Sequence, residues 1–204
     1  MVDFLYSIDK SLFVFCNQTI ANPVFDIVMP FLTDLTQNWF CRILFLLLWL
    51  LLMWKGGKKG RIVGLLLIIL IVVSDQLSSN VIKKIVARPR PCHDIDGVPI
   101  LENIHLLVPC GSGYSFPSSH AVNNFAAGTF LSYYYRKWTW AFMSFAFVIA
   151  FSRLSVGVHY PSDMLGGAII GALIAVLLIQ IWNILSRKFP VLSLEANPSL
   201  PHQL

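Results

Sequence analysis

The feature that most constrains this sequence is a series of apolar runs separated by short basic turns. The clearest run covers residues 39–54, is rich in leucine, and ends at a basic, glycine-rich turn over residues 55–61. A second run follows at once, over about residues 62–82. Runs of this length approach the roughly 20 residues that a helix needs to cross a bilayer. The pattern predicts helices that cross a membrane and turn back.

Composition supports a membrane location for the whole chain. Hydrophobic residues make up 56% of the 204 residues, charged residues only 12%, and the mean hydropathy is +0.70. Soluble domains carry about 25% charged residues, so a soluble fold is excluded. A nucleic-acid partner is not expected, because the net charge is only +5. No cleavable signal peptide is predicted, because Met1–Asp9 lacks a basic start.

Three further apolar runs continue the alternation, over about residues 118–134, 138–154 and 164–185. The predicted fold class is all-α, a polytopic membrane bundle of five transmembrane helices, or six if the N-terminus also spans. Residues 1–35 hold two apolar pieces divided by Asn22-Pro23, which either lie at the interface or form one broken span. A single membrane-embedded domain is expected over residues 1–188. Residues 189–204, with their prolines, are expected to form a disordered cytoplasmic tail.

Basic residues predict which side of the membrane each turn faces, because cytoplasmic loops are rich in lysine and arginine. The turns at residues 55–61, 136–137 and 187–188 are basic and fall on one side. The opposite, extracytoplasmic side then receives the loop 92–116 and three other polar segments, residues 83–91, 116–120 and 152–163. These segments are expected to form one site. The basic residues within 83–91 either violate the rule locally or bind an anion.

The stretch Tyr114–His120 joins the long loop to an apolar helix. Pro117 is expected in the first turn of that helix, with Ser115 or Phe116 at the cap. The first amides of a helix lack an intrahelical partner and, with the helix dipole, bind anions such as phosphate. Here they would be the amides of Ser118, Ser119 and His120. Since the His120 side chain is able to exchange a proton with a bound phosphate, the stretch predicts phosphate chemistry.

Three motifs in these segments resemble those of the type-2 phosphatidic acid phosphatase superfamily, lipid phosphate phosphatases related to vanadium haloperoxidases. Lys83 and Arg90-Pro91, with six residues between them, are similar to the first motif, KxxxxxxRP. Pro117-Ser-Ser-His120 resembles the second, PSGH, with Ser119 in place of its glycine. The segment 152–163 matches the third, SRxxxxxHxxxD. The resemblance covers about residues 40–185, and small bacterial undecaprenyl-diphosphatases are among the members it suggests.

The resemblance implies a role for each motif residue. His159 would attack phosphorus and form a phosphohistidine, and Asp163 would hold the other ring nitrogen of His159. His120 would protonate the leaving oxygen and then activate water. The phosphate would be bound by Lys83, Arg90, Ser118, Ser119 and Arg153. Fixed cationic donors of this kind are the main source of catalysis in phosphoryl transfer, so neither a metal nor another cofactor is expected.

The implied function is hydrolysis of a lipid phosphate or diphosphate, with undecaprenyl diphosphate as the leading substrate. Phosphatidylglycerophosphate and lipid A phosphates are the alternatives. The implied location is the bacterial inner membrane, with the site on the periplasmic or extracellular side. A vanadium-dependent haloperoxidase and an anion channel or transporter are the alternatives from other classes. A channel would not require the pairing of His159 with Asp163. The oligomeric state is not predicted.

Two cysteines of the outer loop, Cys92 and Cys110, are expected to form a disulfide, because thiols on that side meet an oxidising compartment. The bond would tie the basic segment 83–91 to the approach of Pro117. Cys16 and Cys41 lie in apolar segments and are expected to pack as small hydrophobic side chains.

Other polar residues have plainer explanations. Asp75, inside an apolar run, is expected to form a hydrogen bond between helices. Lys84 and Arg88 lack the motif spacing and are expected to contact headgroups or the phosphate surface. Asn123 and Asn124 either orient His120 or join helices. The histidines outside the motifs are expected to be polar surface residues and not metal ligands; they are His93, His105 and His202.

Overall fold

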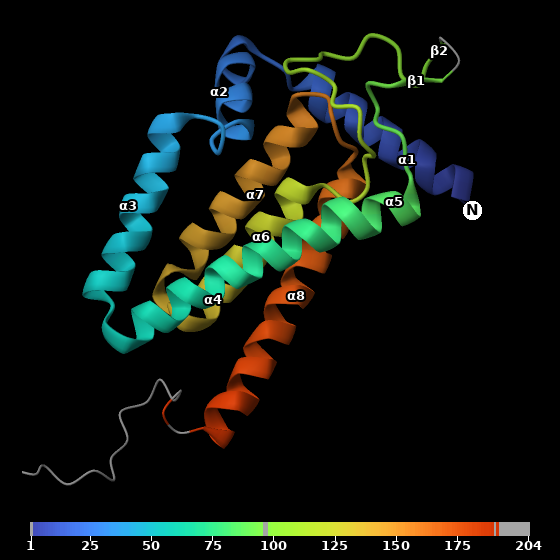
Figure 1. Ribbon diagram of the computed structural model, residues 1–204. Coiled ribbons are helices and arrows are strands. Elements are labelled where there is room, and N and C mark those ends of the chain that lie inside the picture. The colour runs from blue at the N-terminus through green and yellow to red at the C-terminus, as the bar shows by residue number, and fades with distance from the viewer. Residues whose placement is uncertain (1, 96–97, 190, 192–204) are drawn as a thin grey trace, which may run out of the picture.

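The computed structural model describes residues 2–95, 98–189 and 191, and it consists of helices joined by turns and one long loop (Figure 1). The chain begins with α1 (Val2–Val14), which ends in a π-helical turn over Phe15–Thr19 and is followed by α2 (Pro23–Thr33). The side chain of Asn22 caps α2 by accepting hydrogen bonds from two amides of its first turn. The two helices are bent by 114° relative to each other, as a broken or re-entrant span would be.

A helical hairpin follows, formed by α3 (Trp39–Lys55) and α4 (Gly57–Gln76). The chain reverses over two glycines. A Cβ atom on Gly56 would lie 2.3 Å from the carbonyl oxygen of Leu52. Gly57 has φ +59°, a left-handed conformation that glycine adopts without strain. Beyond α4 the helix continues through a π-helical turn (Leu77–Ile82) into α5 (Lys83–Val86).

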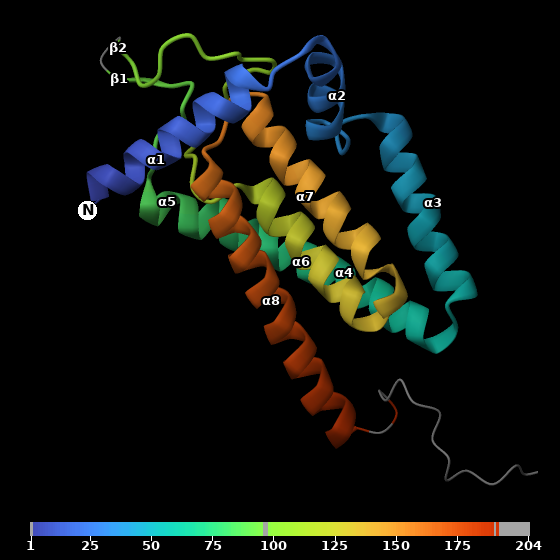
Figure 2. The ribbon, with the colours of Figure 1, turned by 180° about the vertical axis from the view of Figure 1, so that it is seen from behind.

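The centre of the bundle is α6 (Ser119–Tyr134), which packs against α4, α7 (Thr139–Ser155) and α8 (Pro161–Lys188). Figure 2 shows α6 enclosed by these helices. The contact between α6 and α8 is close, because a Cβ atom on Gly171 would lie 2.2 Å from the carbonyl oxygen of Val122. Small residues permit such backbone approach between helices in membranes. A 3₁₀ turn, Arg136–Trp138, joins α6 to α7.

The packed interior is apolar, and so is much of the outer surface. One buried cluster joins α4, α6 and α8 through Val63, Leu66, Leu70, Ala126, Phe130, Ala175 and Ile179. Outward-facing residues such as Leu47, Leu65 and Leu173 are more than half exposed. A bundle that is apolar both inside and outside is typical of a membrane span.

Within the described residues, three helical segments are long and apolar enough to cross a membrane: Gly57–Val86, Arg136–Ser155 and Pro161–Lys188. The bent pair α1–α2 is a fourth if it counts as one span. The predicted helical membrane fold is therefore confirmed. This count is lower than the predicted five or six spans. The difference arises because α3 and α6 have only 17 and 16 residues, fewer than the roughly 20 that cross a bilayer.

One end of the bundle gathers the polar segments (Figure 1). The long loop after α5 lies there with α1, α2 and the turn between α7 and α8. The loop contains a short antiparallel pair, β1 (Asp94–Ile95) and β2 (Val98–Pro99). Cys92 and Cys110 are joined in a disulfide, with Cα atoms 6.0 Å apart. The tail predicted over 189–204 lies outside the described residues, except for Phe189 and Val191.

Candidate active site

The site is built around His159, which lies in the turn between α7 and α8 and is only 2% exposed. Its Nδ1 atom is 3.4 Å from Oδ2 of Asp163, four residues later in the first turn of α8. The helical turn that starts at Pro161 brings the two side chains together. With Nδ1 facing the carboxylate, Nδ1 carries the ring proton and the lone pair is on Nε2.

Asp163 is fixed by several donors and is fully buried. Its carboxylate accepts hydrogen bonds from the amide of Tyr160 at 2.8 Å, from Nη1 of Arg88 at 2.8 Å, and from the hydroxyl of Ser115. The bond from Tyr160 makes Asp163 part of the N-terminal cap of α8. A negative charge is favoured there by the helix dipole. Asp163 therefore stays ionised and keeps one oxygen turned toward His159.

The surroundings of His159 keep its imidazole neutral. Burial lowers the pKa of His159 from 6.5 to about 4, because the charged form loses its hydration. Asp163 acts in the opposite direction and Arg90 and Arg153 act with burial, so the neutral form is favoured overall. A neutral imidazole with a free Nε2 lone pair is a competent nucleophile.

Basic side chains from three segments surround this histidine. Lys83, Arg90 and Arg153 lie close enough to act electrostatically on one another. Arg90 is 8% exposed, and its Nε donates to the carbonyl oxygen of Gly113 at 2.8 Å. Arg153 donates from Nη1 to Thr33 at 2.9 Å. Like charges held together in this way repel one another, and a bound anion would relieve the repulsion.

Two buried polar atoms at the site have no partner among the described residues. They are Nε of Arg153 and the hydroxyl oxygen of Ser118. Buried polar groups are normally hydrogen-bonded, and an exception of this kind indicates a missing ligand or water. Both atoms belong to predicted phosphate-binding residues, so a phosphoryl oxygen would satisfy them.

His120 occupies the first turn of α6, and the two histidines interact electrostatically. The backbone of Thr33 forms a hydrogen bond to the His120 ring. The side chain of Asn124 donates to the His120 carbonyl oxygen and not to the ring. Asn123 donates to Asp75 at 3.0 Å, so these two residues form the predicted bond between helices.

The second motif differs in detail from its prediction. The helix begins at Ser119 and not at Pro117, and the cap is Ser118 instead of Ser115 or Phe116. The amide of Ser118 is not free, because it donates to the carbonyl oxygen of Asp163 at 3.1 Å. The chain therefore stays extended through Ser118. The hydroxyl of Ser119 lies 3.0 Å from that of Ser79, so its side chain is turned toward the π-helical turn after α4.

Sequence reasoning missed two charged residues of the site. The sequence predicts that Arg88 contacts headgroups or the phosphate surface, but in the structure it contacts Asp163 at 2.8 Å and Asp9 of α1 at 2.6 Å. Asp9 was not considered. The available signal was an acidic residue within an apolar segment, which indicates a buried partner in a membrane protein.

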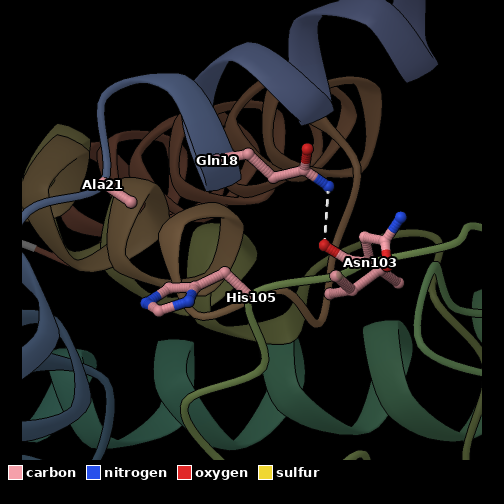
Figure 3. Close-up of a pocket in the computed structure, with 5 residues that line it drawn as sticks. Gln18, Ala21, Asn103 and His105 are labelled. Carbon is pink, nitrogen blue, oxygen red and sulfur yellow. Dashed lines mark hydrogen bonds between the residues drawn. The ribbon is translucent and has the colours of Figure 1, made fainter.

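Two of the histidines outside the motifs, His93 and His105, lie in the long loop. His93 bonds to the loop backbone at Gly111, and His105 lies 2.8 Å from Asp26 of α2. His202 lies outside the described residues. Figure 3 shows His105 beside an open surface hollow of about 450 Å³, lined also by Gln18 and Asn103. The residues that line this hollow do not include His159 or His120.

A second cavity, of about 160 Å³, reaches His120. Its walls are mainly apolar and come from α2, α3, α6 and α7. The apolar lining residues are Leu32, Leu35, Phe45, Phe145 and Ile149. This cavity gives an apolar chain a place beside the predicted general acid.

Comparison with known proteins shows that the chain is similar to phosphatases. A family model described as the PAP2 superfamily matches residues 61–187, which contain all three motifs. A lipid A 4'-phosphatase of Bacteroides thetaiotaomicron is 33% identical over 180 residues, covering 84% of this chain and 75% of that protein. The undecaprenyl-diphosphatase BcrC of Bacillus subtilis is 28% identical, covering 80% and 78%.

A solved structure shares the fold. A transmembrane PAP2-type phosphatidylglycerolphosphate phosphatase from Bacillus subtilis superposes with a TM-score of 0.70 at 23% identity, covering 90% of this chain and 88% of that chain. At this level of identity the likeness concerns the fold alone.

Proposed function

Because this chain belongs to the PAP2 superfamily, we propose that it hydrolyses a lipid phosphate or diphosphate through a phosphohistidine formed on His159. The chain is a membrane lipid phosphatase, as the resemblance of its motifs implied. The observation that supports the catalytic assignment is the buried pair of His159 and Asp163 beside three basic side chains. Such a pair in a cationic pocket fits phosphoryl transfer.

In the first step, Nε2 of His159 attacks phosphorus and the bond from phosphorus to the leaving oxygen breaks. The negative charge of the bound phosphate favours the protonated form of His120, which donates its proton to that oxygen, so the leaving oxygen carries no charge. Asp163 stabilises the positive charge that develops on the His159 ring. Lys83, Arg90 and Arg153 hold the phosphoryl oxygens while negative charge shifts onto the leaving oxygen.

In the second step, the neutral His120 takes a proton from a water molecule, whose oxygen attacks the phosphohistidine. The bond between phosphorus and Nε2 breaks, inorganic phosphate leaves, and both histidines return to their starting states. One proton passes from His120 to the leaving oxygen in the first step, and one passes from water to His120 in the second. The phosphoryl charge is met by the three basic side chains, so the proposed reaction requires no divalent metal.

The leading substrate is undecaprenyl diphosphate, and the alternatives are lipid A phosphate and phosphatidylglycerophosphate. The apolar cavity at His120 supports a substrate with a hydrocarbon chain on the leaving-group side. The relatives named above include a lipid A 4'-phosphatase and an undecaprenyl-diphosphatase, so an assay must include both undecaprenyl diphosphate and a lipid A phosphate. Such substrates fit an enzyme of the bacterial inner membrane whose site faces the periplasm or the cell exterior, as the basic turns predict.

A phosphate-release assay tests this function. The full-length protein, in detergent micelles, receives undecaprenyl diphosphate, a lipid A phosphate or phosphatidylglycerophosphate, each with and without a chelator. We expect release from at least one substrate, undiminished by the chelator and inhibited by vanadate, which resembles the transition state. His159→Ala serves as the control for contaminating phosphatases. Release from none of the substrates, or release that the chelator abolishes, would contradict the proposal.

A further inference from the structure

An acidic residue of α1, Asp9, is buried against the first turn of α8. Asp9 is 8% exposed, although it lies in an amphipathic helix with exposed apolar neighbours. One carboxylate oxygen accepts the amide proton of Ser162 at 2.9 Å, and the other accepts the Ser162 hydroxyl at 2.6 Å. The second oxygen also lies 2.6 Å from Nη2 of Arg88. Asp9 therefore binds both the first turn of α8 and a guanidinium group.

Arg88 connects Asp9 to the proposed nucleophile. Its Nη1 donates to Ser162 at 2.6 Å and to Oδ1 of Asp163 at 2.8 Å. Its guanidinium carbon lies 4.0 Å from the ring centroid of Tyr160, the residue that follows His159. Burial opposes the charge on Arg88, but Asp163 and Asp9 outweigh burial and raise its pKa. Arg88 is thus a fixed cation.

We propose that Asp9 and Arg88 are positioning residues, which hold Asp163 so that its second oxygen faces His159. The proposal rests on the proposed function. Arg88 donates a hydrogen bond to Oδ1 of Asp163, while Oδ2 of Asp163 faces Nδ1 of His159. A guanidinium forms a rigid fork of donors, which suits two carboxylates in different directions. The terminal nitrogens of Arg88 are bonded to Ser162, Asp163 and Asp9 in this arrangement.

The charge on Asp9 has a specific effect in this chain of contacts. With Asp9 present, the positive charge of Arg88 is shared between two carboxylates. Without it, the full charge of Arg88 acts on Asp163, which then stabilises a positive His159 ring less well. The first turn of α8 also loses its bonds from Ser162 to Asp9. Both effects act on the attack by His159 and leave the basic phosphate-binding residues in place.

The contact between Asp9 and Arg88 gives α1 a role in the proposed reaction. This helix precedes residues 61–187, the part of the chain that the family model matches. Asp9 and Arg88 are 79 positions apart, so only the folded chain brings them together. A purely structural role for the ion pair, joining α1 to the segment that follows α5, is the competing explanation. That role would lower the stability of the fold and would leave the turnover of each folded molecule unchanged.

Kinetics of the full-length protein distinguish the two roles. The variants are Asp9→Asn, Arg88→Gln and the double variant, with kcat, KM, vanadate inhibition and the unfolding midpoint measured for each. Asp26→Asn is the matched control, because it removes the same charge from α2, where Asp26 pairs with the partly exposed His105. Asp9→Glu tests whether restoring the charge restores the rate.

We expect Asp9→Asn to lower kcat by about tenfold to a hundredfold, with KM and vanadate inhibition unchanged. This is the range found when a residue that orients a metal-binding histidine by a hydrogen bond is replaced. The double variant should lose no more than Arg88→Gln alone, because Asp9 acts through Arg88. Asp9→Glu should recover part of the rate, and Asp26→Asn should match the wild type.

Two outcomes would overturn the proposal. One is a kcat per folded molecule in Asp9→Asn that equals that of the wild type. The other is a double variant whose loss is the product of the two single losses. If Asp9→Asn does not fold, Arg88→Lys answers the same question, because lysine keeps the charge without the fork. A wild-type protein that releases no phosphate from any substrate would refute the proposed function instead.

Discussion

His159 differs from an ordinary surface histidine in its environment. Its burial removes the hydration that would stabilise an imidazolium, and Asp163 fixes which ring nitrogen bears the proton. The neighbouring cations that would hold a phosphate also disfavour a positive ring before substrate binds. The same residues therefore keep the proposed nucleophile neutral and would attract an anionic substrate.

The lowered pKa of His159 predicts how stability depends on pH. In the unfolded chain this histidine binds a proton below about pH 6.5, but in the folded chain its pKa is about 4. Between these values the unfolded state binds more protons, so the folded state loses stability as the pH falls, by about 1.4 kcal/mol per pH unit. Above pH 6.5 this contribution is constant.

Unfolding midpoints in detergent, measured from pH 7.5 to 4.5, check this expectation. The wild type should lose more stability over this range than His159→Gln, which cannot titrate at that position. Parallel curves for the two proteins would show that His159 titrates alike in the folded and unfolded states.

Motif spacing identifies the candidate catalytic residues because each motif is local in sequence. His159 and Asp163 are one helical turn apart, and such spacing is visible without a structure. The pairing of Asp9 with Arg88 could not be predicted in this way, because it joins α1 to the segment after α5, 79 positions later in the chain. A charge in an apolar segment indicates that a partner exists but does not identify it.

At the scale of elements, the apolar runs predicted the helices well and their ends less well. The second motif shows the physical reason. Proline at position 117 suited a helix start, but the amide of Ser118 is bound to the Asp163 carbonyl, so the helix begins at Ser119. A tertiary contact thus decided a boundary that local preference placed earlier.

The disulfide between Cys92 and Cys110 links two parts of the phosphate site. Arg90 lies two residues before Cys92, and its Nε donates to Gly113, three residues after Cys110. Closing a loop of this size restricts the unfolded chain by roughly 3 kcal/mol in the entropy model. The bond is therefore expected to stabilise the fold and to keep Arg90 in place.

Mass spectrometry of unreduced protein should show a peptide that links Cys92 to Cys110. The double variant Cys92→Ser with Cys110→Ser should lower the unfolding midpoint and raise KM, with Cys16→Ser as the control. Free alkylation of both loop thiols without reductant would contradict the prediction, and so would an unchanged KM in the double variant.

At the scale of the whole molecule, the bent N-terminal pair contacts both halves of the site. Asp9 of α1 acts on the Asp163 side, while Thr33 of α2 contacts Arg153 and His120. From the sequence, this pair is either two interfacial helices or one broken span, because neither piece is long enough to cross a membrane alone. In the structure, Asp9 and Thr33 of this pair contact residues of the candidate site, while Asn17 and Asp26 bond the long loop.

The basic turns predict that the site faces away from the cytoplasm. A cysteine at Glu102, exposed in the outer loop, should react with a membrane-impermeant thiol reagent in intact cells. A cysteine at Lys58, exposed in the first turn of α4, should react only after the membrane is opened. Both are placed in a chain whose Cys16 and Cys41 are replaced by alanine. The reverse labelling pattern would place the site in the cytoplasm and would exclude an outer-leaflet substrate.

The most direct test of the mechanism is to trap the phosphorylated enzyme. Full-length protein is mixed with a substrate that carries labelled phosphorus, quenched in alkali, where phosphohistidine survives, and digested for peptide mapping. The account predicts label on His159, none in His159→Ala, and turnover slower by at least about a hundredfold in His120→Ala. Label on a different residue, or turnover that survives His159→Ala, would contradict it.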